Sequence, residues 1–259
     1  MRPWYEKSFG SEYLKLYAHR DVAEARASIH SIVKLLSLGK DEPVLDLCCG
    51  AGRHLLALHE KGFGPLVGLD LSRELLQAAT RKLTERNGNE HAHNQVRLIQ
   101  ADMRSIPCEN YFAVILSFFT SFGYFDEDEE NQMVLNAAHR SLRPKGRFLI
   151  DYLNQEQVIS HLVAKDEKIL PHRRVQNIRC LTDDCRRVEK RTTIVTDAGT
   201  RHEFHESVRL YSADEMKNML HAAGFVNVRK YGSLEGEEFA PESERLIMIA
   251  QKENNDDQN

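Results

Sequence analysis

Short apolar runs alternate with helical hydrophobic patterns over the middle of the chain, and this alternation predicts an α/β fold. We expect strands over residues 43–48, 66–70, 96–101, 112–116 and 147–152. Helical patterns separate the first of these strands, over about 52–61, 72–86 and 128–142. Because strands that alternate with helices pair in parallel, the pattern predicts a doubly wound parallel sheet.

The pattern changes after Tyr152. Alternating segments fill residues 155–210, and Asp197–Thr200 is typical of a hairpin turn, so we expect an inserted antiparallel sheet. Ser212 and Glu215 then form a capping box that begins another helix. Two final strands, about 225–231 and 245–251, complete the main domain. A turn at Pro144-Lys145-Gly146 is expected to lead into the fifth strand.

These patterns divide the chain into four parts. Residues 1–39 form an N-terminal helical cap, with two helical faces over 9–38. Residues 40–154 and 211–252 form the cofactor-binding core, and 155–210 form an inserted β lid. The polar tail, 253–259, is expected to be disordered.

Composition narrows the class of protein. The 259 residues are 41% apolar with a net charge of -4, which argues against a protein that coats nucleic acid. No run of about 18 apolar residues and no signal peptide are evident, so we expect a cytoplasmic protein without a membrane partner. The five cysteines are expected to be reduced thiols. Cys180 and Cys185 have no second cysteine pair, and we expect no metal site.

The turn after the first strand predicts a cofactor site. Gly50 and Gly52 carry no Cβ, so a ligand can approach the backbone, and the following helix start favours an electronegative group. Asp70 ends the second strand about 20 residues later, where a carboxylate can accept hydrogen bonds from ribose hydroxyls. Asp102 ends the third strand. A dinucleotide site requires a third glycine where this chain has Leu55, which counts against NAD.

Several motifs together resemble the class I S-adenosylmethionine-dependent methyltransferases. They are Val44–Gly52, Gly68–Ser72, Gln100–Met103, Leu142–Arg147 and His221–Phe225. The resemblance covers residues 40–155 and 210–252. It implies a seven-stranded Rossmann-like sheet of order 3-2-1-4-5-7-6 with the seventh strand antiparallel. Trp4-Tyr5, His19-Arg20-Asp21 and Thr120–Tyr124 are similar to a bacterial branch whose substrates are mostly unassigned.

The resemblance also implies roles for individual residues, with S-adenosyl-L-methionine as the cofactor. Asp46, Cys48 and the backbone of Gly50 and Gly52 belong to the motif that holds the methionine end. Asp70 binds the ribose, with Leu71 against the adenine, while Asp102 and Met103 bind the adenine edge and face. Ser117 and Phe118 contribute backbone contacts. The segment around His19-Arg20-Asp21 leaves two alternatives. Either Asp21 simply caps the second helix, or Tyr13, Tyr17 and Arg20 fold over the cofactor pocket.

The methyl acceptor is less defined by the sequence. An aromatic cluster over Phe118–Phe125 favours a small planar, apolar or cationic acceptor, methylated on N or O. Tyr152 and His202 are the candidate catalytic residues. Residues 168–191 hold eight Lys or Arg against three acids, which leaves an anionic small molecule or RNA as alternatives. A DNA acceptor is disfavoured because Ser117–Thr120 replaces the Asp/Asn-Pro-Pro-aromatic motif of amino-group DNA methyltransferases. A protein that binds S-adenosylmethionine without catalysis is a further alternative. The sequence does not predict the oligomeric state.

Overall fold

The computed structural model describes residues 3–16, 22–87 and 95–254. Its main sheet has the order β3-β2-β1-β4-β5-β11-β10, which confirms the predicted 3-2-1-4-5-7-6 arrangement. β11 pairs antiparallel with both of its neighbours, and the other core pairings are parallel. The strands are β1 (Val44–Leu47), β2 (Leu66–Asp70), β3 (Val96–Gln100), β4 (Phe112–Ser117), β5 (Leu142–Leu153), β10 (Phe225–Tyr231) and β11 (Arg245–Lys252).

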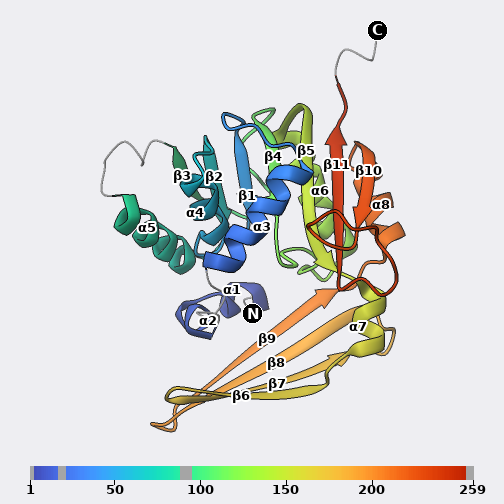
Figure 1. The fold of residues 1–259 in the computed structure, drawn as a ribbon. Helices are drawn as coiled ribbons and strands as arrows, with labels where there is room; N and C mark the ends of the chain where they lie inside the picture. Colours follow the sequence, from blue (N-terminus) through green and yellow to red (C-terminus); the bar gives the residue numbers. More distant parts are fainter. Residues whose placement is uncertain (1–2, 17–21, 88–94, 255–259) are drawn as a thin grey trace.

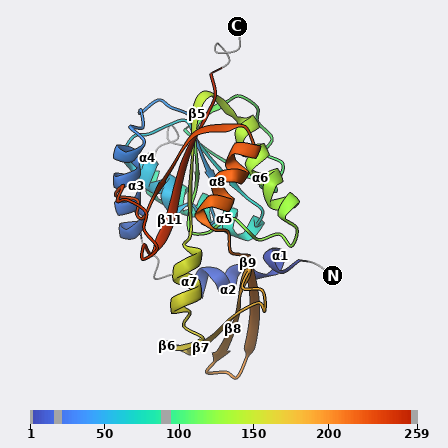
Figure 2. The ribbon, with the colours of Figure 1, turned by 90° about the vertical axis from the view of Figure 1, so that its right-hand side faces the viewer.

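Helices cover both faces of this sheet (Figures 1 and 2). Apolar residues of α3 (Val22–Leu35) and α4 (Arg53–Glu60) pack with Val44 on one face, and α5 (Arg73–Asn87) joins them. Residues of α6 (Asp128–Ser141) and α8 (Ala213–Ala222) pack with Leu45 and Leu47 on the other. β1 is buried at every position because both of its faces are covered.

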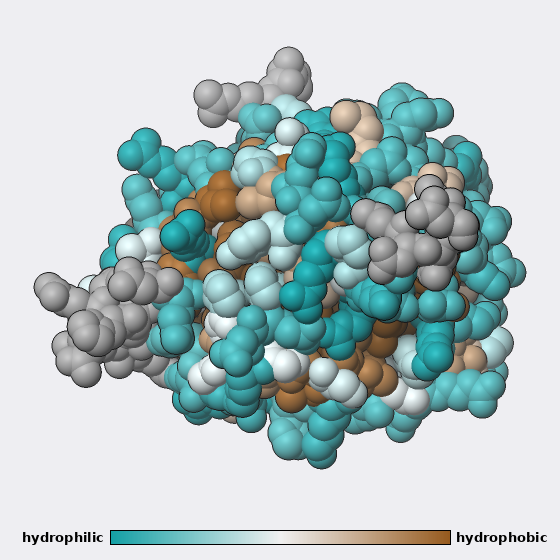
Figure 3. Space-filling view, turned by 90° about the horizontal axis from the view of Figure 1, so that it is seen from above, coloured by the Kyte–Doolittle hydropathy of each residue, from teal (hydrophilic) through white to brown (hydrophobic). Residues whose placement is uncertain are grey.

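The insertion forms a separate antiparallel sheet of order β6-β7-β8-β9, as the alternating pattern predicted. It follows α7 (Gln155–His161) and consists of β6 (Lys165–Leu170), β7 (Arg173–Leu181), β8 (Arg187–Thr196) and β9 (Arg201–Arg209). Figure 1 shows it extending from the core, with α1 (Trp4–Ser8) and α2 (Ser11–Leu16) between the two sheets. The opposite face, seen in Figure 3, is mainly hydrophilic, with apolar residues in recesses.

Two expected boundaries are wrong. Pro144-Lys145-Gly146 lies inside β5 instead of forming a turn before it. There the pairing with β4 moves from Phe112–Leu142 to Val114–Arg147, and Lys145 has a φ of +62°, so the segment is a bulge within the strand. The first helix, expected to begin at Phe9, begins at Ser11 as α2, and an additional short helix, α1, ends at Ser8, so Phe9 lies between the two. The capping box of Ser212 and Glu215 is present as predicted.

Candidate active site

A cavity lies at the carboxyl ends of β1 to β4. The strand order reverses there, because β2 and β3 follow on one side of β1 and the chain then crosses to β4 on the other side. The space encloses about 1270 Å³, including its open mouth. Its walls come from the strand ends, the loop after β4, and the first two helices. This topological switch point is where open α/β sheets bind their ligands.

Asp70 is the central carboxylate of the cavity. It ends β2 and is 8% exposed. One oxygen accepts a hydrogen bond from the N–H of Gly50 and the other from the N–H of Ser72, each at 2.8 Å. Burial raises the pKa of Asp70, and these amide donors partly oppose that rise. The carboxylate is therefore fixed against the glycine turn, and each oxygen retains a further lone pair for a ligand.

Asp46 and His54 are buried near the same turn. Among the described residues, Asp46 Oδ2 and His54 Nε2 have no hydrogen-bond partner. Burial, together with the neighbouring Asp70, raises the pKa of Asp46 to about 8. Burial also holds the pKa of His54 well below its usual value, so the imidazole is neutral. Unpartnered buried polar atoms in a native fold call for a ligand or another functional explanation.

Asp102 is held by Arg104. The guanidinium Nε lies 3.1 Å from both Asp102 oxygens, and the Arg104 N–H donates to Oδ1 at 2.8 Å. These donors outweigh the effect of burial, so the pKa of Asp102 is lowered. Arg104 also lies over the ring of Phe125, 4.2 Å from its centroid. It thereby connects the end of β3 to the aromatic part of the cavity.

The structure brings most of the predicted cofactor residues together. Those that line the cavity are Cys48, Gly50, Asp70, Leu71, Asp102, Met103 and Phe118. Asp46, Gly52 and Ser117 do not line it: Gly52 precedes α4 with a φ of +72°, and Ser117 is buried at the end of β4. Tyr17 and Arg20, and the proposed cap Asp21, lie outside the described residues.

An aromatic wall, defined here as Tyr5, Phe9, Tyr13, Tyr124 and Phe125, forms another side of the cavity. The ring centroids of Phe9 and Tyr13 are 5.1 Å apart, and those of Tyr5 and Phe125 are 5.3 Å apart. Phe9 also stacks on Tyr124 at 5.8 Å. Sequence reasoning assigned no site role to Tyr5 or Phe9, although Tyr5, Phe9 and Tyr13 recur at intervals of four.

Neither candidate catalytic residue lines this cavity. The side chain of Tyr152 is fully buried, and its hydroxyl donates to the carbonyl of Arg209, so it does not point into the cavity. Burial raises the pKa of Tyr152 further from the physiological range. His202 lies on β9 in register with Ile194 of the inserted sheet.

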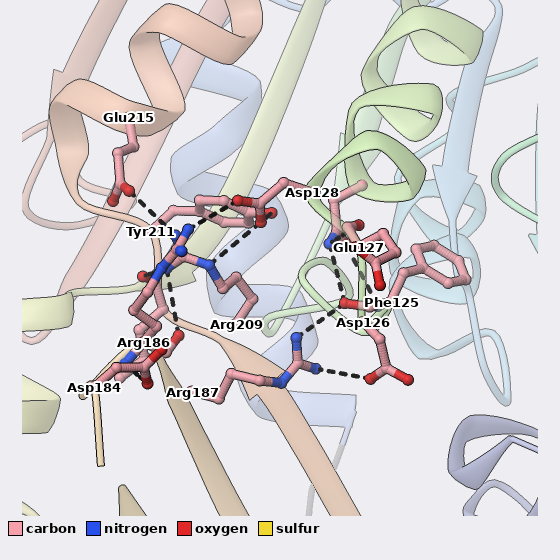
Figure 4. Close-up of polar contacts among 12 residues, drawn as sticks. Phe125, Asp126, Glu127, Asp128, Asp184, Arg186, Arg187, Arg209, Tyr211 and Glu215 are labelled. Carbon is pink, nitrogen blue, oxygen red and sulfur yellow. Dashed lines mark hydrogen bonds and ion pairs between the residues drawn. The ribbon is translucent and has the colours of Figure 1, made fainter. Parts of the chain in front are cut away.

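The base of the insertion is joined to the core by a polar network (Figure 4). Arg209 is 4% exposed and forms ion pairs with Asp128, at 3.3 Å, and Glu215, at 3.2 Å. The Tyr211 hydroxyl donates to Asp128 at 2.6 Å. Arg187 donates to the carbonyl of Phe125 at 2.9 Å, so the insertion directly holds one residue of the aromatic wall.

Most of the basic side chains of the insertion are paired. Six of the eight between residues 168 and 191 form ion pairs, namely Arg173, Arg174, Arg179, Arg186, Arg187 and Lys190. None of the insertion's described residues lines the cavity. Its positive charge is therefore largely neutralised locally, and its contacts reach the cavity through the helices and loops in between.

Neither a metal site nor a membrane-spanning helix is found within the described ranges. No group of three or more His, Cys, Asp or Glu side chains is placed to hold a metal ion there. Within the same ranges, none of the helices combines the length and apolar character that crossing a bilayer demands.

The sheet order, the glycine turn and the carboxylates at successive strand ends define a nucleotide-cofactor enzyme of the Rossmann-like class. Residues 44–146 match the family model described as a methyltransferase domain. The chain is 25% identical over 254 residues to the putative methyltransferase YqeM of Bacillus subtilis, covering 95% of this chain and 96% of that protein. These similarities support the class I S-adenosylmethionine-dependent methyltransferase superfamily, with S-adenosylmethionine as the cofactor.

Solved structures show the same fold over nearly the whole chain. An S-adenosylmethionine-dependent methyltransferase from Clostridium acetobutylicum aligns with a TM-score of 0.78 at 18% identity, covering 94% of this chain and 98% of that one. The sugar N-methyltransferase KedS8 from Streptoalloteichus aligns with a TM-score of 0.71 at 20% identity, covering 95% and 94%. Both alignments are long enough to include most of the insertion as well as the core.

Proposed function

We propose that this methyltransferase transfers the methyl group of S-adenosylmethionine to an amine nitrogen of a small molecule. One observation carries the proposal: carboxylates at the strand ends and an aromatic wall line the same cavity. A donor bound at the strand ends would face the wall, where an acceptor would be held. The fold shared with a sugar N-methyltransferase supports a small amine as the acceptor.

The donor half of the cavity comprises Cys48, Gly50, Asp70, Leu71, Asp102 and Met103. These residues fit S-adenosylmethionine. Asp70 has lone pairs for the ribose hydroxyls, and Leu71 and Met103 offer apolar contacts for the adenine. Asp46 lies beside the glycine turn with one buried, unpartnered oxygen, but it does not line the cavity. Asp102 lines this half as well, and Arg104 contacts both of its carboxylate oxygens.

The aromatic wall suits the charge change of N-methylation. The bound cofactor supplies a methyl group already activated by a positively charged sulfur. When the lone pair of a neutral amine forms the N–C bond, the S–C bond breaks and positive charge appears on nitrogen. The ring faces of Phe9 and Tyr124 would attract that cation and exclude water. The product ammonium can then lose its proton to water, so the wall requires no base.

The alternative of an RNA acceptor receives less support from the charges. RNA binding depends on free Lys and Arg side chains that contact phosphates. Here six of the eight basic side chains between 168 and 191 already form ion pairs. Arg187 is bound to the core through the Phe125 carbonyl, so charge reversal at this position would disrupt the structure and cannot test RNA binding.

The test is an incubation of the protein with S-adenosylmethionine and a panel of small amines that includes amino sugars. Release of the demethylated cofactor should depend on the amine, and mass spectrometry should find the added methyl group in the amine. A matched panel with hydroxyls in place of the amines should give no release. Tight cofactor binding without transfer to any acceptor would instead favour a non-catalytic binding protein.

A further inference from the structure

The loop after β4 contains two consecutive residues in a backbone conformation that their side chains disfavour. Phe119 and Thr120 have φ values of +52° and +65°. Non-glycine residues rarely occupy this left-handed region, and a β-branched residue such as Thr120 is a true outlier there. Such strain persists only where surrounding contacts hold it, and it concentrates at functional sites. Phe118 and Phe119, at this turn, line the cavity.

The contacts that hold the turn come from β5 and β11. The Asp151 carboxylate accepts a hydrogen bond from the N–H of Phe119 at 3.1 Å, and the Asp151 carbonyl accepts one from the N–H of Thr120 at 2.9 Å. Arg245 donates to the other Asp151 oxygen at 2.7 Å and to the Thr120 hydroxyl at 3.0 Å. Asp151 is only 3% exposed, so its carboxylate is largely removed from water, whereas the Arg245 side chain is partly exposed.

The turn at Phe119 and Thr120 also contacts the start of α4. The ring of His54 lies nearly parallel to those of Phe118 and Phe119, with centroids 4.0 Å and 5.6 Å away. The guanidinium of Arg53 lies over Phe119, 4.1 Å from its centroid. Arg53 and His54 directly follow the Gly50–Gly52 turn. A change in the backbone at Phe119 would therefore alter the side of the cavity that Phe118 and His54 form, next to the glycine turn of the donor half.

We propose that Asp151 and Arg245 are positioning residues for the donor half of the cavity. They hold the left-handed turn at Phe119 and Thr120, and the turn sets the position of Phe118 against His54. Neither Asp151 nor Arg245 lines the cavity, so they act through the turn. The inference rests on the donor half of the proposed function and is independent of the acceptor.

The experiment compares Arg245→Met with Arg147→Met. Arg147 also lies on the main sheet, at the opposite end of β5, where its guanidinium pairs with Glu42 and donates to the carbonyl of Leu36. Each variant loses a structural guanidinium, so both should lower Tm. Only Arg245→Met should weaken binding of S-adenosylhomocysteine, by roughly tenfold in calorimetric Kd, because only that variant releases the cavity turn. Equal Kd values for Arg245→Met and the unmodified protein would overturn the proposal.

Two further variants separate positioning from general stability. Arg245→Lys keeps the charge but has no planar fork to reach Asp151 and Thr120 together, so its Kd should be intermediate. Arg245→Met should weaken binding less when Thr120→Gly is also present than it does in the unmodified protein. Glycine adopts a positive φ without strain, so the turn then depends less on Arg245. If the glycine leaves the affinity loss unchanged, the turn is not the route by which Arg245 acts. The readout is binding of the demethylated donor, so failure to find an amine acceptor would not affect it.

Discussion

The donor half of the cavity and the aromatic wall are built in different ways. The donor half comes from the ends of three adjacent parallel strands, within the segment that matches the methyltransferase family model. The wall combines residues 5–13 with Tyr124 and Phe125, which are far away in sequence. The insertion contacts both parts of the wall. Arg187 donates to the carbonyl of Phe125, and the hydroxyl of Ser8, next to Phe9, donates to the carbonyl of His205 at 2.9 Å.

This difference suggests how one cofactor site can serve different acceptors. The strand ends are fixed by the hydrogen bonding of the sheet, so the donor contacts follow from the fold. The wall is fixed by contacts among helices, a loop and an inserted sheet, which can vary while the core stays the same. We propose that residues 155–210 influence the acceptor by positioning α1 and the loop after β4.

The largest expected effect concerns Asp46, behind the donor half. Its pKa of about 8 exceeds the usual value of about 4 for an unfolded chain. Between these values the folded protein holds a proton that the unfolded chain releases, so this group's contribution to stability falls as pH rises. The slope is up to ~1.4 kcal/mol per pH unit. Asp46→Asn cannot titrate, so urea unfolding from about pH 5 to 8 should show a flatter decline in the free energy of unfolding.

The control for this pH series is Asp183→Asn, which changes an exposed carboxylate in the insertion. Its free energy of unfolding should follow that of the unmodified protein at every pH. Parallel profiles for Asp46→Asn and the unmodified protein would contradict the raised pKa of Asp46.

Within the donor half, Asp70→Asn should weaken S-adenosylmethionine binding by roughly 10- to 100-fold, because charge-assisted hydrogen bonds to the ribose are lost. Asp102→Asn should weaken S-adenosylmethionine binding less than Asp70→Asn does, since Arg104 already neutralises the Asp102 carboxylate. Calorimetric titration of both variants with S-adenosylmethionine measures which variant loses more affinity. A larger loss for Asp102→Asn than for Asp70→Asn would show that the ribose and adenine roles are wrongly distributed.

On the aromatic wall, Tyr124→Leu should lower kcat/KM for an amine acceptor by about 5- to 30-fold, the size of a desolvated cation–π contact. S-adenosylmethionine affinity should change little, since the donor half is untouched. Tyr124→Phe keeps the ring face and is the matched control, with activity close to that of the unmodified protein. An equal loss in Tyr124→Phe would assign the effect to the hydroxyl instead of the ring.

The smallest effect is expected on the surface of the insertion. Lys168→Glu and Arg191→Glu reverse two exposed charges for which no ion pair is found within the described residues. Activity on an amine and donor affinity should both stay within about twofold, because exposed charges contribute little at ordinary salt. A loss of binding to RNA together with a loss of activity would instead support the RNA alternative.

The sequence predicted the donor half well because its information is local. A strand followed by a carboxylate places that carboxylate at a known edge of the sheet, which is why Asp70 and Asp102 were located correctly. The resemblance to the methyltransferases implied the sheet order, and the alternating pattern predicted the inserted antiparallel sheet. The bulge at Lys145 was mistaken for a turn.

Only part of the wall was predictable: the aromatic cluster over Phe118–Phe125 contained Tyr124 and Phe125, but the contacts of these residues with Tyr5 and Phe9 join distant segments. Tyr5 reaches Phe125 only because the insertion and the first helices pack together. Tyr152 illustrates the opposite error: proximity to a strand end suggested a catalytic group, but its side chain packs with Phe122 and Tyr211 in the core. Which face of β5 carries Tyr152 depends on register, which the sequence pattern alone does not fix.

The most direct test of the central claim follows an isotope-labelled methyl group from S-adenosylmethionine into product. The unmodified protein is incubated with an amine found to be active in the panel, and magnetic resonance identifies the atom that carries the label. We predict that the label is attached to the amine nitrogen of the small molecule. Label on oxygen, label recovered in added RNA, or a donor that binds but never loses its methyl group would contradict the account.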